Sequence, residues 1–417
     1  MKRFTRAVSL IFEIVFFGFM LLLAAQQNAN AAQAQQLQLP GYFSSEPATD
    51  ASGKELSTAE AAANSDLATF TYTVVSSRDG NTYSGSMVGG NPFPPGQNLS
   101  TTNIDTLVIP VKLVTNSVFF KITNGGALNS KPGVTVFDPT VADDACLKSP
   151  NDVPLTVMEQ SPIFQPEDFT FGPTDVGTTQ YIDAFQRANF WSFVGGTGYH
   201  TLLNPKILAP VIVNVPGDQG LAIPAAAFGG CGPEAVVNIN VFFRQIFPKL
   251  LASEGVSSSQ FPIFLFYNTV MSGSSPNNFK RCCILGFHAA ITQQPRARLQ
   301  TYSFIDFETS GLFIPPIHDT SIAAHEVGEW MDDPFGNNPT PAWGHTGQVG
   351  GCQGNLEVGD PLTATNIPPV TGANGFTYQL QELAFFSWFY GAPSIAVNGW
   401  FSDNNTFKTD AGPVCVK

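Results

Sequence analysis

The sequence predicts an α+β fold with a mixed, twisted sheet and a part rich in β-strands near the N-terminus. Hydrophobic residues make up 43% of the 417 residues, which is enough for a sizeable core. The chain has 36 Phe, 38 Gly and 32 Pro residues, and this composition favours short strands and turns over a helical bundle. Several segments have apolar residues at helical spacing, so we expect helices beside the strands.

The N-terminal 31 residues have the pattern of a secretory signal peptide. Lys2, Arg3 and Arg6 form a basic start, an apolar run follows from Ala7 to Ala25, and small residues at 29–31 offer a cleavage site. The alternative is an uncleaved membrane anchor, because the apolar run is long for a signal peptide. We predict cleavage and a secreted or periplasmic protein with no other association with a membrane.

The remaining chain is divided by composition. Residues 32–65 are rich in Ala, Gln, Ser and Thr, and we predict that they form a flexible linker. Residues 66–417 are expected to form the folded body, with many strands in 66–140 and the region of chemical interest in 280–391. The net charge of -13 argues against nucleic acid as a partner, because its recognition needs a basic patch. We expect a monomer.

The chain contains six cysteines, an even number that indicates disulfides in an exported protein. They are Cys146, Cys231, Cys282, Cys283, Cys352 and Cys415. No C-x-x-C spacing is present, so a zinc ribbon is not expected. Cys282 and Cys283 are adjacent, and we expect them to bond to two different distant cysteines.

Periodicity predicts the main elements of the body. Strands are predicted at 69–75, 105–114 and 261–270, and a pair of strands at 286–292 and 299–308. Helices are predicted at 178–194, 235–251 and 378–391.

One further helix carries the most informative residues, in the stretch AAHEVGEWMDDPF at 323–335. It should begin near Asp319 or Thr320, which are good N-cap residues, and end before Pro334. At about 100° per residue, one side is apolar and the other is polar. The apolar side has Ala323, Ala324, Val327, Trp330 and Met331, and the polar side has His325, Glu326, Glu329, Asp332 and Asp333.

The charge pattern around this helix suggests a bound cation. Between Leu299 and Phe407 there is no Lys or Arg, although the stretch holds eleven Asp and Glu residues. Carboxylates that pack together without a cation repel one another and are costly to bury. His325 and Glu329 are four residues apart, so their side chains are neighbours on the helix. The alternative is that the acidic residues form a solvated surface.

A metal ion would need ligands from outside the helix. The segment GCQGNLEVGDPL, at 351–362, supplies Glu357 and Asp360. We favour Glu357 as the third ligand, with Asp360, His345 or Asp333 as alternative or supporting groups.

These motifs carry a resemblance to a known group of proteins. The pattern H-E-x-x-E-W-x-x-D-P-F, followed by W-G-H-x-G-Q-V-x-G-C and N-L-E-V-G-D-P-L, resembles a group of uncharacterised secreted bacterial zincin-like proteins. A looser similarity is to bacterial relatives of the EXORDIUM-like phosphate-induced family. The first resemblance spans about residues 322–390. It implies a zincin-like fold with an active-site helix, a Zn²⁺ ion and Glu326 as a general base.

The sequence departs from the usual zincin motif H-E-x-x-H, because Glu329 stands where the second His is expected. The extra negative charge weakens the ion as a Lewis acid and favours harder ions such as Mn²⁺ or Ca²⁺. We expect a secreted metal-dependent hydrolase, similar to a zinc metallopeptidase, that acts on a protein or peptide. Tyr378, His345 and His288 are candidate donors to an oxyanion. The alternative is a non-catalytic binding module with a structural ion.

Overall fold

The computed structural model describes residues 42–410 and Cys415, with gaps. The gaps are residues 51, 96, 98, 123–127, 143–146, 148–151, 274, 278–281, 294–297, 314–316 and 345–351. The predicted signal peptide and His345 therefore lie outside the described residues. No helix within the described part is both long enough and apolar enough to cross a membrane.

Seven strands form a closed barrel. In chain order they are β4 (Thr101–Ile122), β10 (Gly220–Ile223), β11 (Glu234–Asn238), β12 (Phe261–Tyr267), β13 (Thr269–Ser272), β14 (Ile284–Gln293) and β15 (Arg298–Phe307). Around the barrel the order is β14, β13, β11, β10, β4, β12 and β15, and an antiparallel pairing of β15 with β14 closes the ring.

Four more strands extend this sheet. They are β1 (Tyr42–Thr49), β5 (Leu128–Phe137), β8 (His200–Ile207) and β9 (Val211–Val215). Strand β1 pairs in parallel with β14, and the other three pair with the long strand β4. Eight short strands form separate pairs: β2 (Thr69–Val75) with β3 (Thr82–Val88), β6 (Glu167–Phe171) with β7 (Thr174–Thr179), β16 (Pro339–Gly344) with β17 (Cys352–Asn355), and β18 (Val370–Thr371) with β19 (Thr377–Tyr378).

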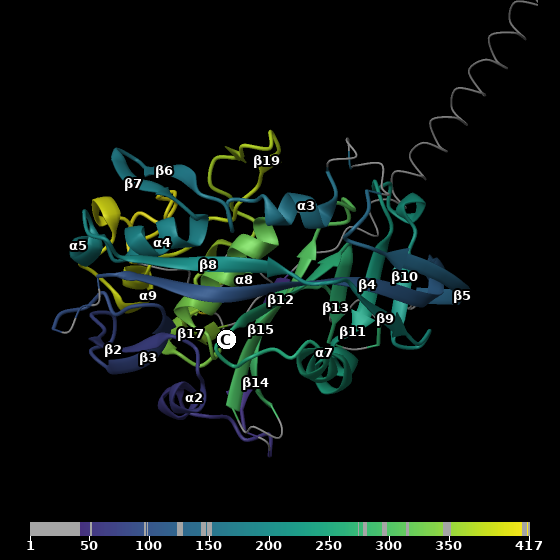
Figure 1. The fold of residues 1–417 in the computed structure, drawn as a ribbon, viewed down its shortest axis with the longest axis horizontal. Coiled ribbons are helices and arrows are strands. Elements are labelled where there is room, and N and C mark those ends of the chain that lie inside the picture. The colour runs from purple at the N-terminus through teal and green to yellow at the C-terminus, as the bar shows by residue number, and fades with distance from the viewer. Residues whose placement is uncertain are drawn as a thin grey trace, which may run out of the picture.

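The helices are short and lie around the strands (Figure 1). They are α2 (Thr58–Asn64), α3 (Pro154–Glu159), α4 (Tyr181–Asn189), α5 (Trp191–Val194), α6 (Ile239–Val241), α7 (Phe247–Ser253), α8 (Ser321–Asp332) and α9 (Phe386–Tyr390). Single turns of other helix types are η1 (Ala225–Ala227), η2 (Phe242–Ile246), η4 (Asp360–Leu362) and η5 (Val397–Gly399).

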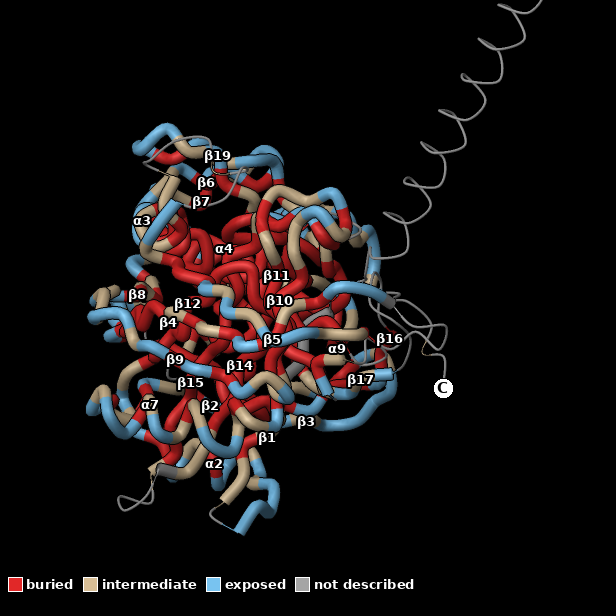
Figure 2. Tube along the Cα trace, turned by 90° about the vertical axis from the view of Figure 1, so that its right-hand side faces the viewer, coloured by how far each residue is buried: buried red, intermediate tan, exposed pale blue. Residues whose placement is uncertain are grey.

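The core has two large parts that meet across the sheet. Strand β12 shows the division, because all seven of its residues are buried. Ile263 and Leu265 belong to the cluster that includes α4 and α8, whereas Phe264 and Phe266 belong to the cluster that includes α7. Figure 2 shows the buried residues concentrated in the middle of the molecule, with exposed residues in the outer loops. A strand buried on both faces has a continuous apolar sequence, which explains the run FPIFLFY.

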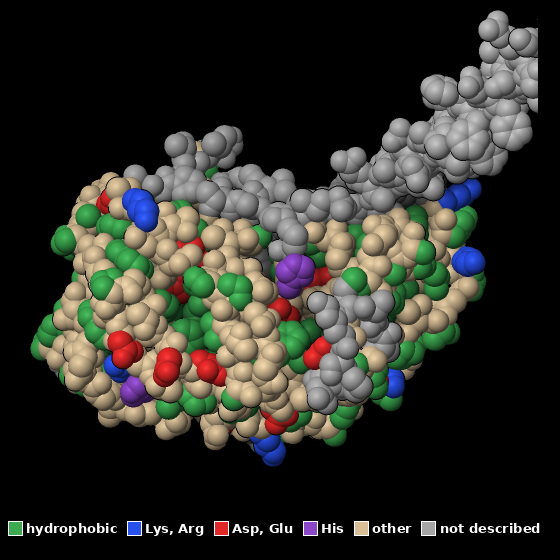
Figure 3. All heavy atoms as spheres, turned by 90° about the horizontal axis from the view of Figure 1, so that it is seen from above, with side chains coloured by type: hydrophobic (Ala, Val, Ile, Leu, Met, Phe, Trp, Pro, Cys, Tyr) green, Lys and Arg blue, Asp and Glu red, His purple; other side chains and the backbone are tan. Residues whose placement is uncertain are grey.

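The surface matches the acidic composition. On the face drawn in Figure 3, Asp and Glu side chains lie across the middle, and Lys and Arg side chains lie towards the margins. The net charge of the whole chain is -13.

The predicted α+β, zincin-like fold is wrong. The structure is mostly β, with 41% strand and 20% helix, and its sheet closes into a barrel. Two predicted helices account for part of the error. Residues 235–238 form β11 between β10 and β13, and Pro248 lies in the first turn of α7, a position that suits proline. At 378–391 only Phe386–Tyr390 is helical. Short apolar runs do not distinguish a buried strand from a buried helix.

The stretch predicted as a flexible linker, 32–65, contains ordered elements in its described part. Strand β1 pairs with β14, and α2 begins with a capping box in which Ser57 and Glu60 bond to each other's backbone N–H groups. Ala48 and Ala61 are fully buried. These residues therefore belong to the folded body.

The predicted disulfide pairing of the adjacent cysteines is also wrong. Cys282 and Cys283 bond to each other. A second disulfide joins Cys352, in β17, to Cys415 near the C-terminus, and Cys231 is disulfide-bonded too. Sequence spacing alone does not determine connectivity.

Candidate metal centre

Helix α8 is present where the sequence predicts it, from Ser321 to Asp332. Every residue of the helix is buried, including Glu326 and Glu329 on its polar side. The alternative of a solvated acidic surface is therefore wrong for this helix. Burying a carboxylate without a partner is costly. The groups that face Glu326 and Glu329 therefore determine which ligand the site can bind.

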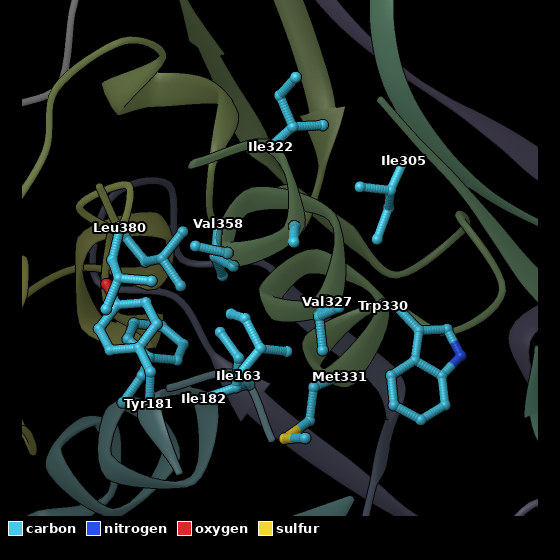
Figure 4. Close-up of a cluster of buried hydrophobic side chains, with 14 of the residues drawn as sticks. Ile163, Tyr181, Ile182, Ile305, Ile322, Val327, Trp330, Met331, Val358 and Leu380 are labelled. Carbon is cyan, nitrogen blue, oxygen red and sulfur yellow. The ribbon is translucent and has the colours of Figure 1, made fainter. Parts of the chain in front are cut away.

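The apolar side of α8 fixes the helix in place. Figure 4 shows Val327 and Met331 pointing towards Ile182 of α4, while Trp330 points to the other side. The Trp330 ring stacks on Phe261 of β12 with 3.6 Å between the ring centroids. The helix also packs against β14 and β15, so its polar side is held rigidly relative to the barrel.

His325 is oriented by a hydrogen bond at one ring nitrogen. The side-chain amide of Gln381 donates to the carbonyl of Gly359 (2.7 Å), so its oxygen accepts from Nδ1 of His325 (3.1 Å). The other nitrogen, Nε2, faces Glu329 Oε1 at 3.0 Å and Asp360 Oδ1 at 3.5 Å. Burial lowers the pKa of His325, but the nearby carboxylates outweigh it and raise the pKa well above its usual value. A cation at Nε2 would replace the proton held there.

His288, in β14, is likewise oriented by a hydrogen bond at one ring nitrogen, and its other nitrogen faces carboxylates. Its Nε2 lies 3.0 Å from the carbonyl oxygen of Asp333, and a carbonyl only accepts, so Nε2 carries the proton. Burial lowers the pKa of His288 to about 4, so the ring is neutral. The bare Nδ1 faces Glu326 Oε2 at 3.5 Å and Glu329 Oε2 at 3.7 Å. A lone pair facing carboxylate oxygens is stable only with a cation or a proton between them.

Glu329 links the two imidazoles through its two oxygens. Oε1 accepts hydrogen bonds from the backbone N–H groups of Gly359 (3.2 Å) and Asp360 (3.1 Å) and faces His325. Oε2 faces His288. Glu329 is therefore the central carboxylate of the site.

Glu326 is the least satisfied side chain of the site. It is fully buried, and neither of its oxygens has a hydrogen-bond partner within the described part of the chain. Burial raises the pKa of Glu326 well above its usual range. Without a cation this carboxyl group would hold a proton.

The segment after β17 closes the site. Glu357 Oε2 lies 3.8 Å from Nε2 of His288, and its Oε1 accepts from the side chain of Asn355. Asp360 uses one oxygen to face His325 and the other to accept from Gln353. Each acid therefore has one oxygen held by an amide. The other oxygen of Asp360 faces Nε2 of His325, whereas that of Glu357 lies near the protonated Nε2 of His288 and not beside its bare Nδ1.

The other predicted groups have different positions. The carboxylate of Asp333 accepts from the backbone N–H groups of Asn337 and Asn338, and burial raises its pKa to about 8. It supports the site only through its carbonyl, which accepts from His288. Tyr378 donates to the carbonyl of Val157 and does not meet the candidate ligands.

At two positions, glycine leaves space for the side chains of His325 and Glu326. A Cβ atom on Gly359 would lie 2.6 Å from Nδ1 of His325, and one on Gly286 would lie 2.6 Å from Oε1 of Glu326. Gly286, His288 and Ala290 share one face of β14, because side chains alternate along a strand. A His between two small residues on one strand face is the signal that could have identified His288 as a candidate ligand.

The ligand chemistry fits a divalent metal ion. Ligand atoms lie within 4.8 Å of one another in two groups that share Glu329, namely His288, Glu329 and Glu357, and His325, Glu326 and Glu329. Imidazole nitrogen and carboxylate oxygen suit zinc, and the many carboxylates also suit manganese. Comparisons of the chain with protein-family models, with curated proteins and with solved structures found no match.

Proposed function

We propose that the protein is an exported metal-binding protein in which a divalent ion is a structural part of the folded body. One observation carries this proposal. Two imidazoles, each oriented by an acceptor behind the ring, turn their other nitrogen towards the same carboxylate, Glu329. Metal-ligating histidines are typically oriented by such a hydrogen bond at the second nitrogen.

Burial favours a structural role over a catalytic one. The side chains of His288, His325, Glu326, Glu329, Glu357 and Asp360 are each 0–3% exposed. A catalytic ion needs an open position that a substrate can reach. An ion held by these residues would instead tie together strand β14, helix α8 and the segment at 357–360.

A second candidate function is metal-dependent hydrolysis of a peptide bond, and Glu326 is the observation that favours it. Its two oxygens have no hydrogen-bond partner among the described residues, and it directly follows a candidate ligand. A zinc ion, or a harder ion such as manganese or calcium, would supply Lewis-acid chemistry here. Glu326 would accept a proton and release it to the leaving group.

Elemental analysis tests the proposal. The wild-type protein should retain about one transition-metal ion per chain through size-exclusion chromatography, and Glu329→Ala should retain none. Glu159→Gln is the control, since Glu159 is exposed at the end of α3. Removal of the ion from the wild type should lower its melting temperature, because an ion at 100 times its Kd stabilises the fold by about 2.7 kcal/mol.

Glu326→Gln distinguishes the two functions. A structural ion predicts no cleavage of unfolded casein by the wild type. Cleavage by the wild type that Glu326→Gln abolishes, with the ion retained, would favour the hydrolase. A wild-type protein that binds no divalent ion and is unchanged by chelators would contradict both functions.

A further inference from the structure

A second group of buried acids lies where three strands of the barrel come together, next to the segment that leads into α8, because Glu308 pairs with Asp319. Glu234 is the first residue of β11, Asp306 lies near the end of β15, and Glu308 follows that strand. β11 and β13 are paired, with Ala235 beside Thr269, and the backbone N–H of Thr269 donates to Asp306 Oδ1 (2.8 Å). One ligand oxygen from each acid lies within 4.8 Å of the other two.

Two of these acids have one oxygen fixed and one free. Glu308 Oε1 accepts from the hydroxyl of Ser310 (2.6 Å) and the backbone N–H of Gly311 (3.2 Å). The remaining oxygens, Glu308 Oε2 and Asp306 Oδ2, have no hydrogen-bond partner in the described structure. The fixed oxygens hold these two carboxylates in one orientation.

Glu234 supplies an independent sign of a ligand. Its side chain is 0% exposed, and both of its oxygens lack a hydrogen-bond partner among the described residues. Buried polar groups in proteins are almost always bonded. A fully buried carboxylate whose two oxygens accept no hydrogen bond, placed against two further carboxylates, indicates that a cation or shared protons lie between the three acids.

The occupant must be positively charged. Among the described residues, no Lys, Arg or His forms an ion pair with any of the three acids. Three mutually repelling carboxylates in a buried position are costly. Protons bound to the acids are the alternative to a metal ion, because burial and the neighbouring carboxylates raise the pKa of Glu234 well above its usual range.

The group of acids lies beside a cavity. Glu308 lines a cavity of about 950 Å³, together with Thr309, His318 and Asp319.

We propose that Glu234, Asp306 and Glu308 form a second cation site, distinct from the centre on α8, that takes a hard divalent ion through oxygen ligands alone. Carboxylate oxygens without nitrogen or sulfur ligands are typical of calcium, magnesium and manganese sites. Calcium is the best probe, because it accepts irregular sets of oxygen ligands.

Equilibrium dialysis with calcium tests the site in the full-length protein after the first centre has been loaded with zinc. The zinc-loaded wild type should bind one calcium ion per chain. Glu234→Gln and Asp306→Asn should each weaken calcium binding at least tenfold, whereas Glu159→Gln should bind like the wild type. Calcium should raise the melting temperature of the zinc-loaded wild type and of Glu159→Gln, but not of Glu234→Gln.

Two results would overturn the proposal. A zinc-loaded wild type that binds no calcium, magnesium or manganese would show that the acids share protons instead, and this measurement does not depend on the folding of any variant. Calcium binding by a folded Glu234→Gln that equals that of the wild type would place the calcium elsewhere. Neither result concerns the centre on α8, because Glu329→Ala reports on that centre separately.

Discussion

His325 and His288 show how single side chains define the candidate metal centre. Each ring has one nitrogen fixed by an acceptor, Gln381 for His325 and the carbonyl of Asp333 for His288. This arrangement sets the tautomer and turns the second nitrogen towards Glu329. The centre is therefore sensitive to any change that shifts a ring by a few tenths of an ångström, even if the ligands themselves stay intact.

Gly359→Ala tests this sensitivity. Gly359 has an ordinary backbone conformation, with φ −85°, so alanine adds no backbone strain. The added Cβ would lie 2.6–2.8 Å from three atoms of the His325 ring and must displace it. We expect metal affinity to fall about 10–100-fold and the free energy of unfolding to fall by about 1–3 kcal/mol. Calorimetric titration with zinc and urea unfolding measure the two effects.

Gly354→Ala is the control for this variant. A Cβ on Gly354 meets no atom closer than 3.8 Å, and the residue is exposed near the same segment. It should match the wild type in both measurements. Equal zinc affinity in Gly359→Ala and Gly354→Ala would mean that His325 is not a ligand.

At the scale of elements, the position of α8 depends on the contact between Trp330 and the barrel. The ring stacks on Phe261, and its N–H donates to the hydroxyl of Thr301 (3.1 Å). All three residues are buried. Because α8 also carries His325 and Glu329, the same contact positions these candidate metal ligands.

Trp330→Ala should therefore affect stability and metal binding together. We expect a loss of about 3–5 kcal/mol in the free energy of unfolding, as for other buried aromatic residues, and weaker zinc binding. Met331→Leu, a change at the next buried position that keeps the volume, should cost less than about 1.5 kcal/mol. Urea unfolding followed by circular dichroism avoids the loss of the Trp330 fluorescence signal. If Trp330→Ala is less stable than the wild type but binds zinc with the same affinity, the packing of Trp330 does not position the candidate ligands on α8.

The elements that could be predicted from the sequence are those with strong local signals. Helix α8 and the paired strands β14 and β15 match the predicted positions, because each has a long, clear period. His325 and Glu329 are neighbours as predicted, since helical spacing alone brings them together. The Glu357 and Asp360 side chains reach the site through a loop whose path the sequence does not reveal.

What could not be predicted depends on contacts between distant segments. His288 lies in a strand more than thirty residues before His325, and the sequence suggests it only as a candidate donor to an oxyanion, because nothing local shows that it faces Glu329. The residues of β11 form a strand only because β10 and β13 lie on either side. Closure of the barrel rests on such pairings, and local propensity carries no information about them.

At the scale of the whole molecule, strand β1 connects the N-terminal part of the body to the metal centre. Along their parallel pairing, Ser45 lies opposite His288, so β1 supports the backbone that positions this ligand. The following helix α2 contributes the buried Ala61. These contacts lie within the segment that composition alone suggests is a linker.

A chain that begins at Asp66 should therefore be less stable than one that begins at Tyr42. Each ladder hydrogen bond lost from β1 should cost about 0.5–1.5 kcal/mol, and the zinc affinity of the shorter chain should be lower. Thermal unfolding of the two purified proteins, with and without zinc, measures the difference. Equal melting temperatures would show that β1 and α2 contribute nothing to the fold.

The burial of the metal centre also has a consequence for the rate of ion exchange. Since the six candidate ligands are 0–3% exposed, a chelator would not reach an ion bound between them while the native structure is intact. The ion should leave only when α8 or the segment at 357–360 detaches, at a rate that does not depend on the concentration of chelator. That rate should rise steeply with temperature, as unfolding rates do, and Trp330→Ala should increase it. The protein would then keep its ion through long exposure to chelators in its surroundings, because its retention is set by the lifetime of the fold.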